Sequence, residues 1–298
     1  MNKWWWLLLI VLLWAAVGFA IFGLRREQKP IGAPLPSKVE RIVSTAPSLT
    51  EILYALGLSD RIVAVSNDSD YPPEATKKKK VGTFWYPSIE AVIAAEPDLV
   101  VTLGIEQQKN LAERLRQMGY NCLTLHIEKI SDLFEAIEII GAATGRQTEA
   151  KSLVSDIRDR LNDLSSLAVG REKVKVLWVV QREPLRVAGR DTFVNEMIEL
   201  AGGENAIGPT LHKYPPIGAE QVIASAADVI IEPAMGQQNL AEQQNSAVRH
   251  WNKFSNLPAA RHGQIYVIDA DTICRLGPRI SQGAKSVAIC LRPDLLAK

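Results

Sequence analysis

The chain repeats one pattern in its two halves. Residues 88–101 (SIEAVIAAEPDLVV) align without a gap with residues 218–231 (GAEQVIASAADVII), and five of the 14 positions are identical. The apolar positions agree throughout, and each copy reads as a short helix followed by an apolar strand. Residues 49–57 likewise echo residues 194–202, and both segments end in glycine. This internal repeat predicts two similar lobes within the 298 residues.

Strand-like and helix-like segments alternate in both halves. The apolar runs predict strands at 41–44, 62–65, 99–103, 122–125, 174–180, 229–231 and 265–268. Helices are predicted at 48–57, 88–95, 107–118, 192–201, 220–225 and 279–289, and Ser48-x-x-Glu51 predicts a capping box that opens the first of them. Alternation of this kind predicts an α/β fold with a mostly parallel sheet in each lobe and helices on the sheet faces.

A long helical segment lies between the two halves. Residues 130–141 and 147–167 are both helix-like, and the second stretch contains neither proline nor glycine. Its apolar side chains share one stripe, at Leu153, Ile157, Leu161 and Leu164. We therefore expect one helix, about 30 Å long, to join the lobes. Between the lobes we expect a cleft at the carboxyl ends of the strands, the usual ligand position in such sheets.

The N-terminal segment has a different composition from the rest. Residues 4–24 contain no charge, and 19 of the 21 are apolar. A helix of that length is about 31 Å long and matches a bilayer core. A cleaved signal peptide and a retained anchor are both compatible with it. The run exceeds the ~7–15 apolar residues of a signal peptide, and Gly18-Phe19-Ala20 is a poor cleavage site, which favours the anchor.

These features predict a domain organisation. The segments are a membrane anchor or signal helix (1–26), a proline-rich linker (27–37), an N-terminal α/β lobe (38–145), a connecting helix (146–170) and a C-terminal α/β lobe (171–298). The first cysteine is Cys122, so we do not expect a lipidated N-terminal cysteine. The charges that flank the apolar segment do not decide its orientation.

The composition excludes several classes of function. With 34 basic and 33 acidic residues, the net charge of +1 gives no field to attract nucleic acid. The phosphate-binding glycine motifs and the G-x-S-x-G nucleophile motif do not occur. Four histidines and three cysteines lack the spacing of metal sites, so we expect no bound metal and no cofactor. An enzyme is not expected, although a scattered catalytic triad in the cleft stays the alternative from another class.

Several motifs together resemble a known family. They are Thr45-Ala-Pro-Ser-Leu-Thr-Glu-Ile-Leu53, Ser69-Asp-Tyr-Pro-Pro-Glu-Ala75, Glu199-Leu-Ala-Gly-Gly-Glu-Asn205 and Arg275-Leu-Gly-Pro-Arg279. In order and spacing they resemble periplasmic vitamin B12-binding proteins over residues 38–290, approximately. That family supplies ABC importers with cobalamin, haem or iron–siderophores. The resemblance implies an extracytoplasmic, monomeric binding protein that delivers a corrinoid to a permease dimer with its ATPase subunits. A haem or iron–siderophore ligand is the alternative, and the N-terminal segment would tether the protein to the cytoplasmic membrane.

The resemblance also assigns roles to two glutamates. Glu90 and Glu220 occupy matched positions in the repeat, each near the first turn of a predicted helix. The family uses one such glutamate in each lobe to dock arginines of the permease, through charge-assisted hydrogen bonds. The alternative is a carboxylate that merely stabilises the start of its helix, by about 0.3–1 kcal/mol.

Candidate ligand contacts lie in loops that follow the strands. In the first lobe they are Pro47, Tyr71, Phe84, Trp85 and Tyr86, and in the second Tyr214, Asp271 and Arg275. Flat ligands such as a corrin or a porphyrin pack well on aromatic faces, whereas ordinary packing beneath a proline-rich loop is the alternative. Thr272 and Ile273 stand where B12-binding members often carry aromatics, which weakens the case for cobalamin. We expect the lysine run 77–80 to be a solvated face, with attraction of an anionic ligand as the alternative.

Overall fold

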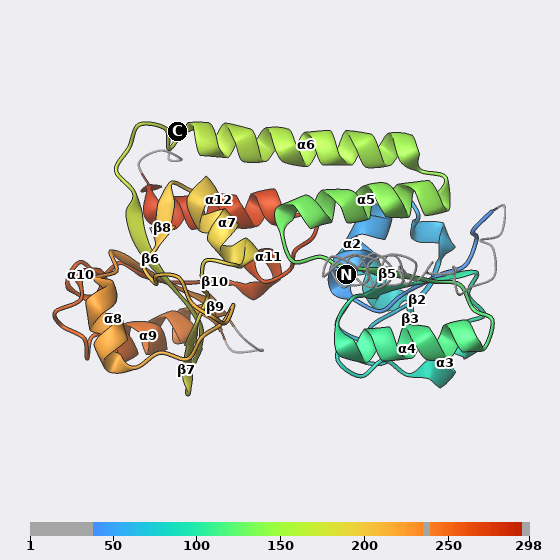
Figure 1. The fold of residues 1–298 in the computed structure, drawn as a ribbon, viewed down its shortest axis with the longest axis horizontal. Coiled ribbons are helices and arrows are strands. Elements are labelled where there is room, and N and C mark those ends of the chain that lie inside the picture. Colours follow the sequence, from blue (N-terminus) through green and yellow to red (C-terminus); the bar gives the residue numbers. More distant parts are fainter. Residues whose placement is uncertain (1–37, 235–238, 294–298) are drawn as a thin grey trace, which may run out of the picture.

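A computed structural model describes residues 38–234 and 239–293. The anchor and linker predicted at 1–37 lie outside these residues. Within the described ranges, no helix is long and apolar enough to cross a membrane. The described chain forms two α/β lobes side by side, with one long helix running across both (Figure 1).

The N-terminal lobe contains a five-stranded sheet in the order β3-β2-β1-β4-β5, and all its neighbouring strands are parallel. Its elements are β1 (Ile42–Ser44), α2 (Pro47–Ala55), η1 (Ser59–Arg61), β2 (Ile62–Val65), η2 (Pro73–Lys77), β3 (Lys79–Lys80), α3 (Ile89–Ala94), β4 (Leu99–Leu103), α4 (Glu106–Gln117), β5 (Cys122–Leu125) and α5 (Ile130–Thr144). The central strands are buried on both faces, as expected where helices cover a parallel sheet on either side.

The C-terminal lobe has a mixed sheet in the order β10-β9-β6-β7, with β8 also paired to β6. Its elements are β6 (Val174–Arg182), β7 (Leu185–Val187), α7 (Phe193–Leu200), β8 (Gly203–Asn205), α8 (Ala219–Ser225), β9 (Val229–Ala234), α9 (Leu240–Trp251), α10 (Pro258–Arg261), β10 (Ile265–Asp269), α11 (Ala270–Ile273) and α12 (Ile280–Leu291). Strand β7 runs antiparallel to β6, whereas β8, β9 and β10 follow the parallel pattern.

Helix α6 (Gln147–Ser166) connects the two sheets, as the sequence predicts. It packs against α5 of the first lobe and against α7 and α12 of the second (Figure 1). Its buried side chains are Ala150, Val154, Ile157, Leu161 and Leu164, while Leu153 is only partly buried. One continuous apolar core extends from the first lobe through this helix into the second, so the helix is part of the packed interior of both.

The internal repeat is reproduced in backbone detail. Glu96 and Ala226, equivalent in the alignment, adopt left-handed φ values of 47° and 45° directly after their helices. Two residues further on, the side chain of Asp98 accepts from the amide of Arg41 at 2.9 Å, and that of Asp228 accepts from Lys175 at 3.0 Å. Each lobe thus ends its short helix and ties the next strand to its neighbour in the same way, which confirms the repeat.

One local expectation is wrong, and one helix is missed. Helix α2 begins at Pro47 with Ala46 as its N-cap, so Ser48 does not cap it and Glu51 is free to bond elsewhere. The proline fixes a helical φ and starts the helix one residue earlier. Helix α9 has no counterpart in the prediction because its polar face and scattered apolar residues hide its period. The lysine run 77–80 is largely exposed, as expected for a solvated face, and Lys78 and Lys80 also donate to backbone carbonyls.

Candidate functional site

The two lobes touch where helix α2 meets the turn that precedes α12. A Cβ atom on Gly277 would stand 3.6 Å from the Cα of Ser48 and 3.5 Å from a carboxylate oxygen of Glu51. A small residue at this position lets the turn lie close to the first turn of α2. The predicted contact Pro47 is the first residue of that helix and is half-buried. Two of the resembling motifs, 45–53 and 275–279, are therefore neighbours in space.

A buried ion pair crosses between the lobes at this contact. The Glu51 side chain is only 2% exposed, and Arg279 donates to it through Nε at 2.9 Å and Nη2 at 2.6 Å. The bidentate geometry is the strongest form of a carboxylate–guanidinium contact. The Arg279 guanidinium also lies 3.8 Å from the centre of the Tyr71 ring. Tyr71, predicted as a ligand contact, is thus in place between the lobes but already carries a cation on its face.

A second arginine binds acids of both lobes. Arg275 donates to the two carboxylate oxygens of Asp70 at 2.5 and 3.2 Å, and its Nη2 lies 2.9 Å from Asp271 of its own lobe. The hydrogen bond from Arg275 lowers the pKa of Asp70, whereas burial raises the pKa of Asp271. We name the set Glu51, Asp70, Tyr71, Asp271, Arg275 and Arg279 the interlobe cluster. It unites three predicted ligand contacts, namely Tyr71, Asp271 and Arg275.

The other aromatic candidates of the first lobe form a separate group. Phe84 and Trp85 stack edge to face with ring centres 4.8 Å apart, and Phe84 also packs against the main core. The amide of Phe84 donates to Asp68 at 2.5 Å, which holds this loop beside the one that carries Asp70. Tyr86 is 81% exposed. Phe84 therefore combines packing and partial exposure, while Trp85 and Tyr86 offer open aromatic surface.

Tyr214 of the second lobe lies near another interlobe contact. Its neighbour Lys213 pairs with Glu128 of the first lobe, and close by Lys129 pairs with Asp191 at 2.7 Å. Burial raises the pKa of the Tyr214 phenol, with Cys274 and Glu128 adding to the effect. The predicted contacts Tyr214 and Asp271 are therefore both placed where the lobes meet.

Glu90 and Glu220 are exposed side chains in the first turns of α3 and α8, one in each lobe. Hydrogen bonds from its own backbone amide and from the Ser88 hydroxyl lower the pKa of Glu90. The Ser88 bond to Glu90 is 3.0 Å long, and the same hydroxyl accepts from Ala91 N as the helix cap. The matching residue in the second lobe is Gly218, which has no side chain to offer.

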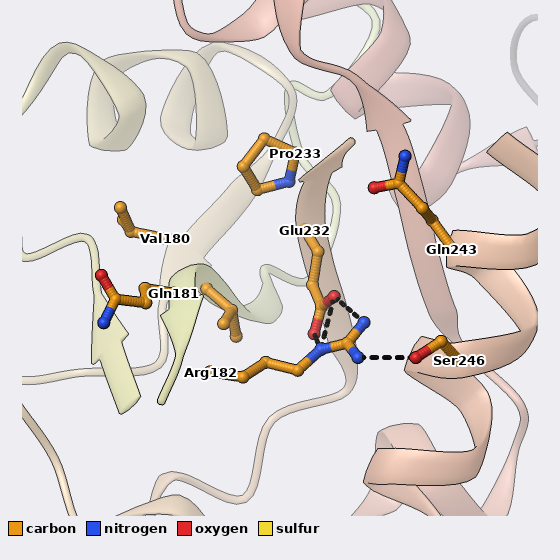
Figure 2. A pocket seen from close by; sticks show the side chains of 8 residues that line it. Val180, Gln181, Arg182, Glu232, Pro233, Gln243 and Ser246 are labelled. Carbon is orange, nitrogen blue, oxygen red and sulfur yellow. Dashed lines mark hydrogen bonds and ion pairs between the residues drawn. The ribbon is translucent and has the colours of Figure 1, made fainter. Parts of the chain in front are cut away.

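A polar pocket of about 260 Å³ lies at the carboxyl ends of β6 and β9 (Figure 2). Glu232 is buried here, and Arg182 clasps it through Nε at 3.1 and 3.0 Å and through Nη2 at 2.5 Å. Trp251 Nε1 donates to the same carboxylate at 2.6 Å, and Arg182 also donates to Ser246 Oγ at 3.0 Å. The charges of this pocket are paired within one lobe.

The sequence does not point to several of these residues. Glu51 and Arg279 belong to the quoted motifs, yet their pairing spans 228 positions, and nothing local reveals it. Asp70 lies within the motif 69–75, so attention to charged motif residues would have found it. Arg182 and Glu232 sit in strands, where an isolated charge in an apolar run is the available signal.

The family model described as "Periplasmic binding protein" matches residues 42–272. The chain belongs to this periplasmic binding protein family. It is 30% identical to the vitamin B12-binding protein of Vibrio parahaemolyticus, covering 81% of this chain and 85% of that protein. It is 29% identical to an ABC transporter substrate-binding lipoprotein, YvrC, of Bacillus subtilis, covering 86% and 81%. The protein is thus a substrate-binding protein of an ABC importer and not an enzyme.

Solved structures of this family share the fold. The vitamin B12-binding protein BtuF of Vibrio cholerae superposes with a TM-score of 0.75 at 26% identity, covering 87% of this chain and 98% of that one. The haem-binding protein RhuT of a Roseiflexus species gives a TM-score of 0.74 at 27% identity, covering 86% and 99%. The two-lobe α/β architecture predicted from the sequence is confirmed. Relatives that are named for different ligands resemble this periplasmic binding protein about equally.

Proposed function

We propose that this protein binds a corrinoid between its two lobes and delivers it to the permease of an ABC importer. The observation that carries the proposal is the meeting of Tyr71 from one lobe with Asp271 and Arg275 from the other in one interlobe cluster. The exposed rings of Trp85 and Tyr86 supply apolar area for a flat ring system, and the acids supply acceptors for its polar edge.

A thermal-shift assay with cyanocobalamin, haemin and several ferric siderophores tests the ligand. A ligand at 100 times its Kd should stabilise the folded protein by about 2.7 kcal/mol, provided that it does not bind the unfolded chain. We expect cyanocobalamin to give the largest shift and the triple variant Y71A/D271N/R275A to lose it. A shift with haemin or a siderophore alone would replace the corrinoid by that ligand.

For delivery, we propose that Glu90 and Glu220 dock the two lobes onto a permease dimer. Both carboxylates are exposed, occupy equivalent positions of the repeat and belong to different lobes, as a receptor with two-fold symmetry requires. Neither glutamate belongs to the interlobe cluster, so docking and ligand contact would use different side chains.

Charge reversal tests the docking role. The double variant E90R/E220R should lose transport in cells that depend on this protein, while purified protein keeps its ligand affinity. A matched control is E113R/E242R, which reverses one exposed helical glutamate in each lobe. Normal uptake by E90R/E220R, or equal loss in the control, would contradict docking through these residues.

For location, we propose that the protein works outside the cytoplasm, tethered by the apolar segment 4–24. The support is its family and the length of that segment. A fusion with residues 1–37 deleted and replaced by a cleaved signal peptide should shift the protein from the membrane fraction to the soluble periplasmic fraction. Equal recovery of both forms in the soluble fraction would contradict a retained anchor.

A further inference from the structure

Ion pairs join the two lobes, and each matches a cationic side chain of one lobe with a carboxylate of the other. Five such pairs are found among the described residues: Arg275 with Asp70 and, at 3.8 Å, with Glu51, Arg279 with Glu51, Lys129 with Asp191, and Lys213 with Glu128. The two arginines belong to the interlobe cluster, where three carboxylates face two guanidinium groups. At neutral pH, the cluster therefore carries one excess negative charge.

We propose that Asp70 determines ligand specificity by neutralising Arg275, so that the site selects uncharged, amide-bearing ligands and rejects ligands recognised through carboxylates. This inference rests on the proposed function, since it assumes that the ligand meets Asp271 and Arg275. It assigns Asp70 a role that the ligand-contact prediction does not contain.

Geometry explains the rejection of carboxylates. Asp70 engages both terminal nitrogens of Arg275, and the arginine side chain is only 18% exposed. A ligand carboxylate could reach that guanidinium only by displacing Asp70, which would leave Asp70 unpaired near Asp271 and Glu51. Asp70 is half-exposed, so water offsets part of the loss of its partner, and the main cost is the repulsion of a further carboxylate by Asp70, Asp271 and Glu51.

The same atoms favour amide donors. The Asp70 and Asp271 side chains are 49% and 46% exposed, so part of each carboxylate is accessible to a ligand. A carboxylate has about four acceptor positions, and contact with one arginine leaves some of them open. Carboxamide N–H groups around a corrin ring can donate to these positions without breaking the ion pair. Haem propionates offer acceptors only.

The decisive comparison uses two ligands with one ring. Dicyanocobinamide carries carboxamides, and dicyanocobyrinic acid carries carboxylates at the corresponding positions. Titration calorimetry at pH 7 should show that the wild-type protein prefers the amide. In D70N, Arg275 keeps Asp271 but loses the carboxylate that engages both of its terminal nitrogens, so the ratio of the two Kd values should narrow at least tenfold. D156N, which removes an exposed acid from α6, should leave the ratio unchanged.

Each further outcome decides one point. If the wild type binds cobinamide but D70N and a second variant, D70S, leave the ratio unchanged, the role of Asp70 is wrong while the proposed corrinoid ligand stands. If the wild type binds neither corrinoid, the proposed ligand is wrong. The role of Asp70 is then tested by the affinity of D70N and wild type for haemin. Haemin should then bind D70N at least tenfold more tightly than wild type, and equal binding would overturn the inference. Thermal midpoints of D70N and D70S verify that both variants fold.

Discussion

The two lobes repeat one pattern but neutralise their buried charges differently. Glu51 in the N-terminal lobe depends on Arg279 from the opposite lobe, whereas Glu232 in the C-terminal lobe is satisfied by Arg182 and Trp251 of its own. The buried Glu232 therefore needs no partner from outside the C-terminal lobe. The N-terminal lobe buries a carboxylate that only the other lobe can pair, so its stability and the closeness of the lobes are linked.

Removing the interlobe partner should have the largest effect. In R279A the nearly inaccessible Glu51 keeps only Arg275, at 3.8 Å, as a cationic neighbour. We expect the free energy of unfolding to fall by about 3–5 kcal/mol, as for other buried pairs broken on one side. Urea unfolding measures this change, and hydrogen exchange should show faster opening in α2 of the N-terminal lobe.

The double variant E51A/R279A is the control. Since it removes both charges, its loss in free energy of unfolding should be smaller than the sum of the losses in E51A and R279A. A loss below about 1 kcal/mol in R279A would place this pair among ordinary surface salt bridges.

Breaking the pair within the C-terminal lobe should have a smaller effect. In R182A, Glu232 still accepts from Trp251 Nε1, and the removal of a partly exposed arginine opens a path for water. We expect a loss of about 1.5–3 kcal/mol, the range for a hydrogen bond to a charged group. Ligand affinity should change less than in R279A. If the free energy of unfolding fell more in R182A than in R279A, the proposed difference between the lobes would be wrong.

Much of this architecture follows from local pattern. Apolar runs locate seven of the ten described strands, while the two- and three-residue strands β3, β7 and β8 are missed because they are too short to show a pattern. The glycine-free stretch of α6 identifies the connecting helix. The repeat places Glu90 and Glu220 correctly because both lie inside aligned segments. Pairings such as Glu51 with Arg279 do not follow, since they depend on the relative position of two lobes. Helix α9 is missed because its inward face holds few apolar residues, chiefly Ala247 and Trp251.

The N-terminal caps of α3 and α8 provide a smaller contrast between the lobes. Ser88 caps α3 and holds Glu90, while Gly218 occupies the equivalent position before α8. S88A should lower stability by about 1 kcal/mol through loss of the cap. It should also raise the pKa of Glu90 in NMR titration, because one hydrogen bond to the carboxylate disappears. S88T should restore both properties.

The reciprocal change is G218S. A Cβ at this position meets open space, and the backbone φ of −97° suits serine. The new hydroxyl should stabilise the protein by a few tenths of a kcal/mol, the usual difference between glycine and serine caps. Destabilisation by G218S would indicate that α8 requires glycine at its N-cap.

Acid should expose the opposite behaviour of the two carboxylates on Arg275. The hydrogen bond from Arg275 lowers the pKa of Asp70 in the folded state, so this group stabilises the fold above its unfolded value of about 3.9. That contribution disappears as pH falls through the lower folded pKa. Because Asp70 is half-exposed, we expect it to amount to less than about 1 kcal/mol.

Asp271 has the reverse sign. Burial raises its folded pKa, so its ionised form opposes folding at neutral pH, and that opposition vanishes on protonation. Urea unfolding between pH 7 and pH 2.5 should therefore show D70N less stable than wild type at neutral pH, with the difference shrinking below about pH 4. D271N should approach or exceed the wild type at neutral pH and lose that advantage in acid. If the stabilities of D70N and D271N, each relative to wild type, changed with pH in the same way, Asp70 and Asp271 would not have opposite effects on stability.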